Sequence, residues 1–187
     1  MLTDFTNRRS WFRPLALAVI LVVAACTAAP AQEEPSDEYE IRAAMIFNMT
    51  KFVDWPNWRM ADAGGKFVVC ELGTDPVTPS LENTFRGKVI FGRQAAMHRL
   101  AKTESAGGCH ILYVAVSERK RFAELAPQLG KDAVFSVGYQ DWFTSSGGLV
   151  SLPTVDDRVH IQINLGAARQ QGFTVSSKLL RLATIVQ

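Results

Sequence analysis

The sequence has few of the residues and motifs on which most enzymes depend. Histidine occurs only three times in 187 residues, and none of the three lies at a spacing that suits a metal site. It contains no glycine-rich nucleotide-binding motif (G-x-G-x-x-G or G-x-x-x-x-G-K-[ST]) and no G-x-S-x-G nucleophile motif. The sequence therefore predicts a protein that is not an enzyme and that uses no cofactor or metal ion.

Cysteines and long apolar runs are also scarce. Three cysteines, none of them in a C-x-x-C pair, are too few for a small protein held together by disulfides. A transmembrane helix needs about 18 uninterrupted apolar residues, and no segment after the N-terminal region reaches that length. With 48% hydrophobic and 20% charged residues, the composition is typical of a globular domain.

The N-terminal region has the three parts of an export signal. Several arginines precede an apolar run over residues 15–25, and small residues follow it. Cleavage before Cys26 would make this cysteine a lipidated N-terminus, whereas cleavage before Gln32 would release an unanchored protein. Both sites fit, so we expect residues 1–31 to be a signal peptide and leave the cleavage site open.

The export signal also carries the chain's excess positive charge. Residues 1–25 hold three arginines and Asp4, so 20 basic and 18 acidic residues become 17 of each after cleavage. A formally neutral protein has no general attraction for nucleic acid. We expect a polar tether over residues 32–37 and a single domain over residues 38–187.

Apolar periodicity predicts alternating helices and strands. The expected helices cover residues 37–55, 76–85, 117–129, 167–171 and 176–186. The expected strands cover residues 67–72, 88–91, 109–116, 133–137, 149–152 and 159–165, while residues 94–100 fit either an extended piece or a helical turn. This order predicts an α/β fold: a single-domain sandwich of a mostly parallel mixed sheet flanked by helices, with a C-terminal antiparallel hairpin that turns at Asp156-Asp157.

Cys70 and Cys109 remain after the signal region is set aside. A bridge between them would close a loop that the chain-entropy model values at about 4 kcal/mol. However, Cys70 lies deep in its predicted strand and Cys109 begins another. Parallel neighbours in simple register would then hold the two thiols too far apart. Two free buried thiols are the alternative to the bridge.

Two groups of residues are candidates for contacting a partner. Trp55 and Trp58 follow the first predicted helix, where aromatic side chains can anchor an interface, although packing in the core is the alternative for Trp55. Arg158, His160 and Gln162 lie on the polar face of the predicted hairpin, with plain solvation as their alternative.

Several segments of the chain resemble the YfiR/HmsC-like family of periplasmic proteins. The similarity extends over about residues 38 to 185, and no single motif decides it. The matching segments are Ile41 to Pro56 (IRAAMIFNMTKFVDWP), Phe67 to Gly73 (FVVCELG), Cys109 to Val114 (CHILYV), Val159 to Arg169 (VHIQINLGAAR) and Ser176 to Ala183 (SSKLLRLA).

The resemblance implies a non-enzymatic, homodimeric regulator of the periplasm. Proteins of this type bind the periplasmic sensory domain of a membrane-bound diguanylate cyclase, lower cyclic di-GMP output and restrain biofilm formation. The family is redox-sensitive, and well-known members carry a second cysteine pair in the C-terminal half. This sequence has no such pair, so redox sensing would rest on Cys70 and Cys109, and a lipid on Cys26 would be the only membrane attachment.

A second function is also open. Open α/β sheets bind ligands at the carboxyl ends of their strands. The chain is therefore also a candidate periplasmic small-ligand binding domain that serves a sensor or an uptake system.

Overall fold

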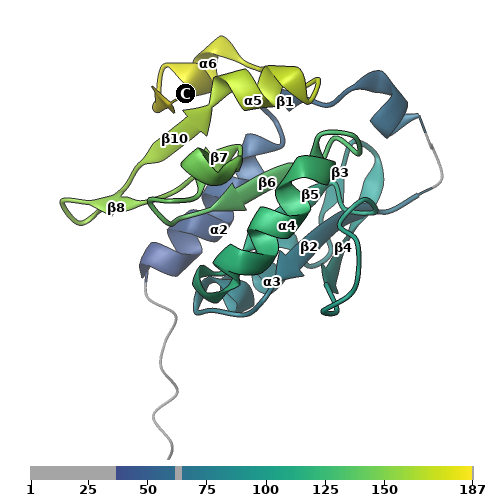
Figure 1. Ribbon diagram of the computed structural model, residues 1–187, viewed down its shortest axis with the longest axis horizontal. Coiled ribbons are helices and arrows are strands. Elements are labelled where there is room, and N and C mark those ends of the chain that lie inside the picture. Colours follow the sequence, from purple (N-terminus) through teal and green to yellow (C-terminus); the bar gives the residue numbers. More distant parts are fainter. Residues whose placement is uncertain (1–36, 62–64, 187) are drawn as a thin grey trace, which may run out of the picture. The chain divides into compact units, whose positions relative to one another are not determined.

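The structure is a computed structural model that describes residues 37–61 and 65–186, all within one compact unit, Pro35–Gln187. The expected signal peptide, Cys26 and most of the tether lie outside the described residues. The main sheet has eight strands, and five of its seven neighbouring pairs are parallel. The predicted α/β fold with a mostly parallel mixed sheet is confirmed (Figure 1).

The strand order explains how the chain winds. From one edge to the other the strands are β12 (Ala183–Val186), β10 (Ile161–Asn164), β7 (Val150–Ser151), β6 (Phe135–Gly138), β5 (Ile111–Val114), β2 (Phe67–Leu72), β4 (Arg93–Arg99) and β3 (Val89–Ile90). The first strand, β2, lies inside the sheet, and later strands are added on both sides of it. Residues 94–100, which fit either an extended piece or a helical turn, are extended in β4.

Helices cover both faces of this sheet. The helical segments are α2 (Asp37–Met49), η1 (Asn57–Met60), α3 (Val77–Phe85), η2 (Val116–Glu118), α4 (Arg119–Leu129), η3 (Thr144–Ser146), α5 (Leu165–Gln170) and α6 (Ser177–Leu180). In Figure 1, α4 crosses the front of the sheet and α2 runs behind it. Two small additional sheets pair β1 (Val53–Asp54) with β11 (Thr174–Val175) and β8 (Thr154–Val155) with β9 (Arg158–Val159).

Each face of the sheet has its own hydrophobic core. Because side chains alternate along a strand, Phe67 and Val69 of β2 enter the core beneath α2 and α3, and Cys70 and Leu72 enter the core beneath α4. The α2/α3 core is the larger, and it includes residues from α5 and α6 as well. The α4 core is smaller, and Phe122 stacks there on Phe143 with 4.6 Å between ring centroids.

The first helix is shorter than the sequence predicts. It ends at Met49, so the prediction that it continues to residue 55 is wrong. The Thr50 hydroxyl donates to the Phe47 carbonyl at 2.7 Å, and the chain then extends into β1, which pairs with β11. This pairing joins Val53 to Val175, far apart in the sequence, and a helical continuation would forgo it.

The predicted helix over residues 176–186 is also wrong. Only α6 is helical there, and the chain then forms β12, which runs parallel to β10 with Ile185 opposite Ile163. Thr184, Ile185 and Val186 are β-branched and suit a strand better than a helix. The free side of β10 supplies the backbone partners that make the strand form.

The C-terminal hairpin is confirmed. β7 pairs antiparallel with β10, and the connection between them forms the β8–β9 ribbon, which projects from the sheet in Figure 1. Asp156 and Asp157 both have left-handed backbone angles, with φ of 50° and 57°. Two such residues between paired strands form the tight turn whose twist suits a hairpin, and aspartate tolerates this conformation.

Candidate functional site

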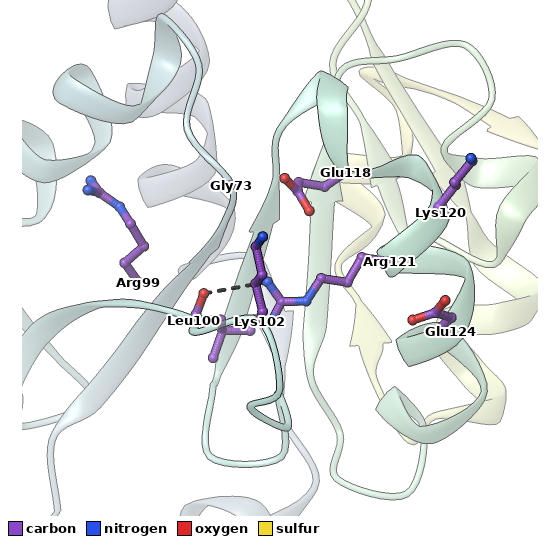
Figure 2. A pocket seen from close by; sticks show the side chains of 8 residues that line it. All are labelled: Gly73, Arg99, Leu100, Lys102, Glu118, Lys120, Arg121 and Glu124. Carbon is purple, nitrogen blue, oxygen red and sulfur yellow. Dashed lines mark hydrogen bonds between the residues drawn. The ribbon is translucent and has the colours of Figure 1, made fainter.

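The carboxyl ends of β2 and β5 form the point at which the winding of the sheet reverses. After β2 the chain passes through α3 toward β4, whereas after β5 it passes through α4 to β6 on the other side. The two connections leave in opposite directions, which is where ligands commonly bind in open α/β sheets. A cavity of about 440 Å³ lies here, lined by Gly73, Arg99, Leu100, Lys102, Glu118, Lys120, Arg121 and Glu124 (Figure 2).

Four of the lining side chains are basic and two are acidic. Figure 2 shows Arg121 reaching from α4 to the Leu100 carbonyl, to which it donates at 3.5 Å. Lys120 points away from the cavity in the same view. Gly73 has a φ of 79°, and a Cβ at this position would overlap the Glu118 side chain, so a glycine is needed for the close approach.

A buried carboxylate lies next to this cavity. Glu71 of β2 is 2% exposed, and its Oε2 accepts from Arg99 at 3.3 Å, while its Oε1 has no partner. Arg99 also pairs with Glu82 of α3 at 3.1 Å. Burial, followed by the negative charge of Glu82, raises the pKa of Glu71 to about 7. The carboxyl can therefore change protonation near neutral pH.

A second polar cluster ties the loop after β2 to the sheet. The Tyr113 hydroxyl of β5 donates to both carboxylate oxygens of Asp75, at 2.9 and 2.8 Å. Asp75 Oδ1 also accepts from the Val77 N–H at 3.0 Å, which satisfies a free donor in the first turn of α3. Burial and the Asp75 charge raise the pKa of Tyr113 well above its usual range, so this phenol acts only as a donor.

The structure joins Cys70 to Cys109 in a disulfide, with 5.7 Å between the Cα atoms. The strands are in parallel register, with Cys70 opposite Leu112, so Cys109 is offset from it by three positions. The two cysteines can still meet because the chain turns just before β5, which brings Cys109 back beside Cys70. In this turn the Cys109 N–H donates to the Ala106 carbonyl at 2.9 Å. Both cysteines then lie in the core beneath α4.

His110 is a buried structural residue at the entrance to β5. Its Nδ1 accepts from the Val68 N–H at 3.1 Å, and its ring stacks on Phe67 with 4.7 Å between centroids. Burial, together with the positive charges of Arg59 and Arg93, lowers the pKa of His110 to about 4. The imidazole is therefore neutral at physiological pH.

The two tryptophans differ sharply in exposure. Trp55 is only 7% exposed and packs edge-on against Phe67 and Phe173, each with 5.7 Å between ring centroids. It is part of the larger core, which is the alternative that the sequence left open. Trp58, in η1, is 58% exposed. Of these two residues, Trp58 is the one that presents its indole to solvent.

The polar hairpin residues lie in a different part of the surface. Arg158 is exposed and lines a groove of about 490 Å³ between the β8–β9 ribbon and the first turns of α2, together with Glu38 and Ile41. His160 is exposed, and Gln162 of β10 is half-buried. The structure therefore does not join the predicted residues into one site, because Trp58 belongs to η1, beside the starts of β4 and β5.

Sequence reasoning missed the exposed apolar residues at the β12 edge. Leu182 is 75% exposed and Ile185 is 45% exposed, in the segment where a helix was predicted. The run of β-branched residues at 184–186 was the available signal.

Ser117 and Lys120, at a serine–lysine spacing found in some hydrolases, were also missed. The Ser117 hydroxyl contacts the adjacent Glu118 carboxylate at 3.4 Å.

Comparison with known proteins identifies the family. The YfiR/HmsC-like family matches residues 39–184, which include nearly all of the described domain. The chain belongs to the YfiR/HmsC-like family. A search of curated proteins finds no match.

Between Asp37 and Val186, excluding residues 62–64, no group of three or more His, Cys, Asp or Glu side chains is placed to hold a metal ion. In the same part of the chain no helix is long and apolar enough to span a membrane.

Proposed function

We propose that this protein is a non-enzymatic regulator of the bacterial periplasm. It binds the periplasmic domain of a membrane-bound diguanylate cyclase and represses it, which lowers cyclic di-GMP and biofilm formation. The observation that carries this proposal is the family match over residues 39–184. The predicted export signal supports the location, and the Cys70–Cys109 disulfide fits an oxidising compartment.

The proposal extends to assembly and attachment. By family resemblance the protein is a homodimer. The export signal, and not the family resemblance, makes Cys26 its candidate lipid anchor. We assign partner contact to Trp58 and to Arg158, His160 and Gln162, because these side chains are exposed or half-buried. Trp55 is left out of this surface because its indole is packed in the core.

Deletion of the gene in its host tests repression directly. We expect cyclic di-GMP to rise in the deletion strain and to return to its original level when the wild-type gene is restored. Intact-mass measurement of the mature protein would separately show whether Cys26 carries a lipid. Equal cyclic di-GMP with and without the gene, under oxidising and unstressed conditions, would refute repression.

One observation favours the second candidate function, the binding of a small anion. The cavity at the carboxyl ends of β2 and β5 is lined by an excess of basic over acidic side chains. Calorimetric titration with inorganic phosphate and with succinate tests it, using Lys102→Ala/Arg121→Ala as the impaired variant. Binding of either anion that the double variant loses would support this function, and absence of heat with both anions would exclude it.

A further inference from the structure

The sheet edge formed by β12 is apolar and uncovered within the described residues. β12 is the terminal strand and pairs only with β10, so the backbone groups on its outer side have no strand partner in the described chain. Leu182 and Ile185 are 75% and 45% exposed beside this edge. A row of unpaired N–H and C=O groups flanked by apolar side chains is a template for another strand.

The opposite edge of the same sheet is protected. There β3 has only two residues, Lys88 precedes it, and the turn at Phe91-Gly92 has φ angles of 52° and 77° that end the strand abruptly. Short strands, lysines and tight turns are the usual means by which proteins prevent edge pairing. Residues 182–186 of the β12 edge contain neither a charge nor a proline. Val89 and Phe91 at the β3 edge are also exposed, at 56% and 53%, so the two edges differ in strand length, charge and turn geometry and not in apolar exposure.

A groove beside β12 can accept side chains of an added strand. It has a volume of about 500 Å³ and lies between β12 and α5. Leu165, Ala167 and Val186 supply apolar lining, and Arg169 supplies a positive charge. An occupant of this groove would therefore combine an apolar side chain with a nearby carboxylate.

The charged side chains of the C-terminal segment that follows Asp157 are all basic. No aspartate or glutamate follows Asp157 in the sequence, whereas Arg169, Lys178 and Arg181 all follow it and are exposed. None of these three takes part in the ion pairs found among the described residues. Two copies of the chain meeting at this edge would bring like charges together, while an acidic partner would be attracted.

We propose that an extended, acidic segment of a partner protein adds to β12 as a further strand of the sheet. Its apolar side chains pack on Leu182 and Ile185, and its carboxylates pair with Arg169, Lys178 and Arg181. Main-chain hydrogen bonds supply affinity, and the groove and charges supply selectivity. The inference rests on the proposed function only for the identity of the partner, the periplasmic domain of the cyclase.

A labelled peptide tests the surface without reference to the cyclase. The mature protein is titrated by fluorescence anisotropy against a peptide in which valine alternates with glutamate, and against the same peptide with lysine in place of glutamate. We expect the acidic peptide to bind at least about tenfold tighter. We expect Leu182→Asp/Ile185→Asp to abolish that binding, because it removes the apolar contacts and repels the glutamates, and Val89→Asp, on the opposite edge, to leave it unchanged. Equal binding of the two peptides, no binding of either, or full binding by the edge variant overturns the inference.

The same variants in the deletion strain separate this inference from the proposed function. We expect the edge variant to leave cyclic di-GMP at the level of the deletion strain, and Val89→Asp to restore repression. If the wild-type gene itself does not repress, the proposed function fails while the peptide result still decides the surface. If the edge variant represses as well as the wild type, the edge is not the cyclase-binding surface. If sedimentation shows that the edge variant converts a dimer into a monomer, the edge joins two copies and the inference is wrong.

Discussion

The two faces of the sheet are stabilised by different means. On one face, α2, α3, α5 and α6 contribute to a large hydrophobic core that also contains the Tyr113 ring of β5. On the other face, α4 covers a smaller core that contains the disulfide. Adjacent residues show the contrast: Cys70 faces the smaller core and Glu71 the larger. The covalent bond lies where less apolar surface is buried.

Breaking the disulfide is expected to have the largest effect. The bridged cysteines are 39 positions apart, and the loop-entropy relation gives a loss of about 4 kcal/mol in the free energy of unfolding for Cys70→Ala/Cys109→Ala. Urea unfolding with and without reductant measures it. Reductant should destabilise the wild type and leave the double variant unchanged.

A loss below about 1 kcal/mol would contradict the view that the bridge stabilises the smaller core. Phe122→Ala removes apolar packing from the same core, and its loss in the free energy of unfolding can be compared with that of the cysteine variant. Because the bridge acts mainly on the unfolded chain, the two losses should add.

Protonation of Glu71 is expected to have the next largest effect. Its carboxyl titrates near 7 in the folded chain and near 4.5 when unfolded, so it adds stability as pH falls between these values, and this stability is lost as pH rises through 7. His110 acts in the opposite direction, because its depressed pKa, about 4 instead of 6.5, removes stability as pH falls through that range. The wild type should therefore be nearly insensitive to pH between 6.5 and 4.5.

Glu71→Gln should reveal the pH dependence of stability that His110 contributes. We expect the variant to be more stable than the wild type above pH 7, by up to about 3 kcal/mol, and to lose stability steadily on acidification. Urea unfolding across this pH range measures both effects. Glu124→Gln makes the same charge change at an exposed position and should keep the wild-type profile. A Glu71→Gln profile that coincides with that of the wild type would show that Glu71 does not titrate in this range.

Tyr113→Phe, on the face of the larger core, is expected to have a moderate effect on stability. It removes the donor to Asp75 and keeps the ring, so we expect a loss of about 1–3 kcal/mol in the free energy of unfolding. Asp75→Asn alone and combined with Tyr113→Phe completes a double-mutant cycle. If the two changes are simply additive, the hydroxyl and the carboxylate do not stabilise one another.

Leu182→Lys at the uncovered edge is expected to have the smallest effect on stability. The side chain is 75% exposed, so thermal unfolding should change by less than about 0.5 kcal/mol. Leu179→Lys, three residues earlier and 4% exposed, should be strongly destabilising because it buries a charge in the larger core. A large loss for Leu182→Lys would mean that this edge belongs to the packed domain.

The interior strands could be predicted from sequence because they are continuous apolar runs. Residues 111–114 and 67–72 are buried along nearly their whole length, as parallel strands covered on both sides require. The turn at Asp156-Asp157 followed from its residue types.

The pairings between distant segments could not be predicted. β1 forms because Val175 is available to Val53, and β12 forms because β10 has a free side. Local periodicity instead favoured helices at both places. The approach of Cys109 to Cys70 depends on a turn before β5 that strand register alone does not reveal. For Trp55 the sequence left interface contact and core packing open, and the aromatic cluster around its indole decides for the core.

The disulfide also determines what a protease can release. Cys70 lies in β2 and Cys109 lies just before β5, so the segment between them, with α3, β3 and β4, is a closed covalent loop. A single cut anywhere in that loop leaves two polypeptides held as one molecule. Such a nicked protein would migrate intact on a gel under oxidising conditions and separate into two fragments once the thiols are reduced.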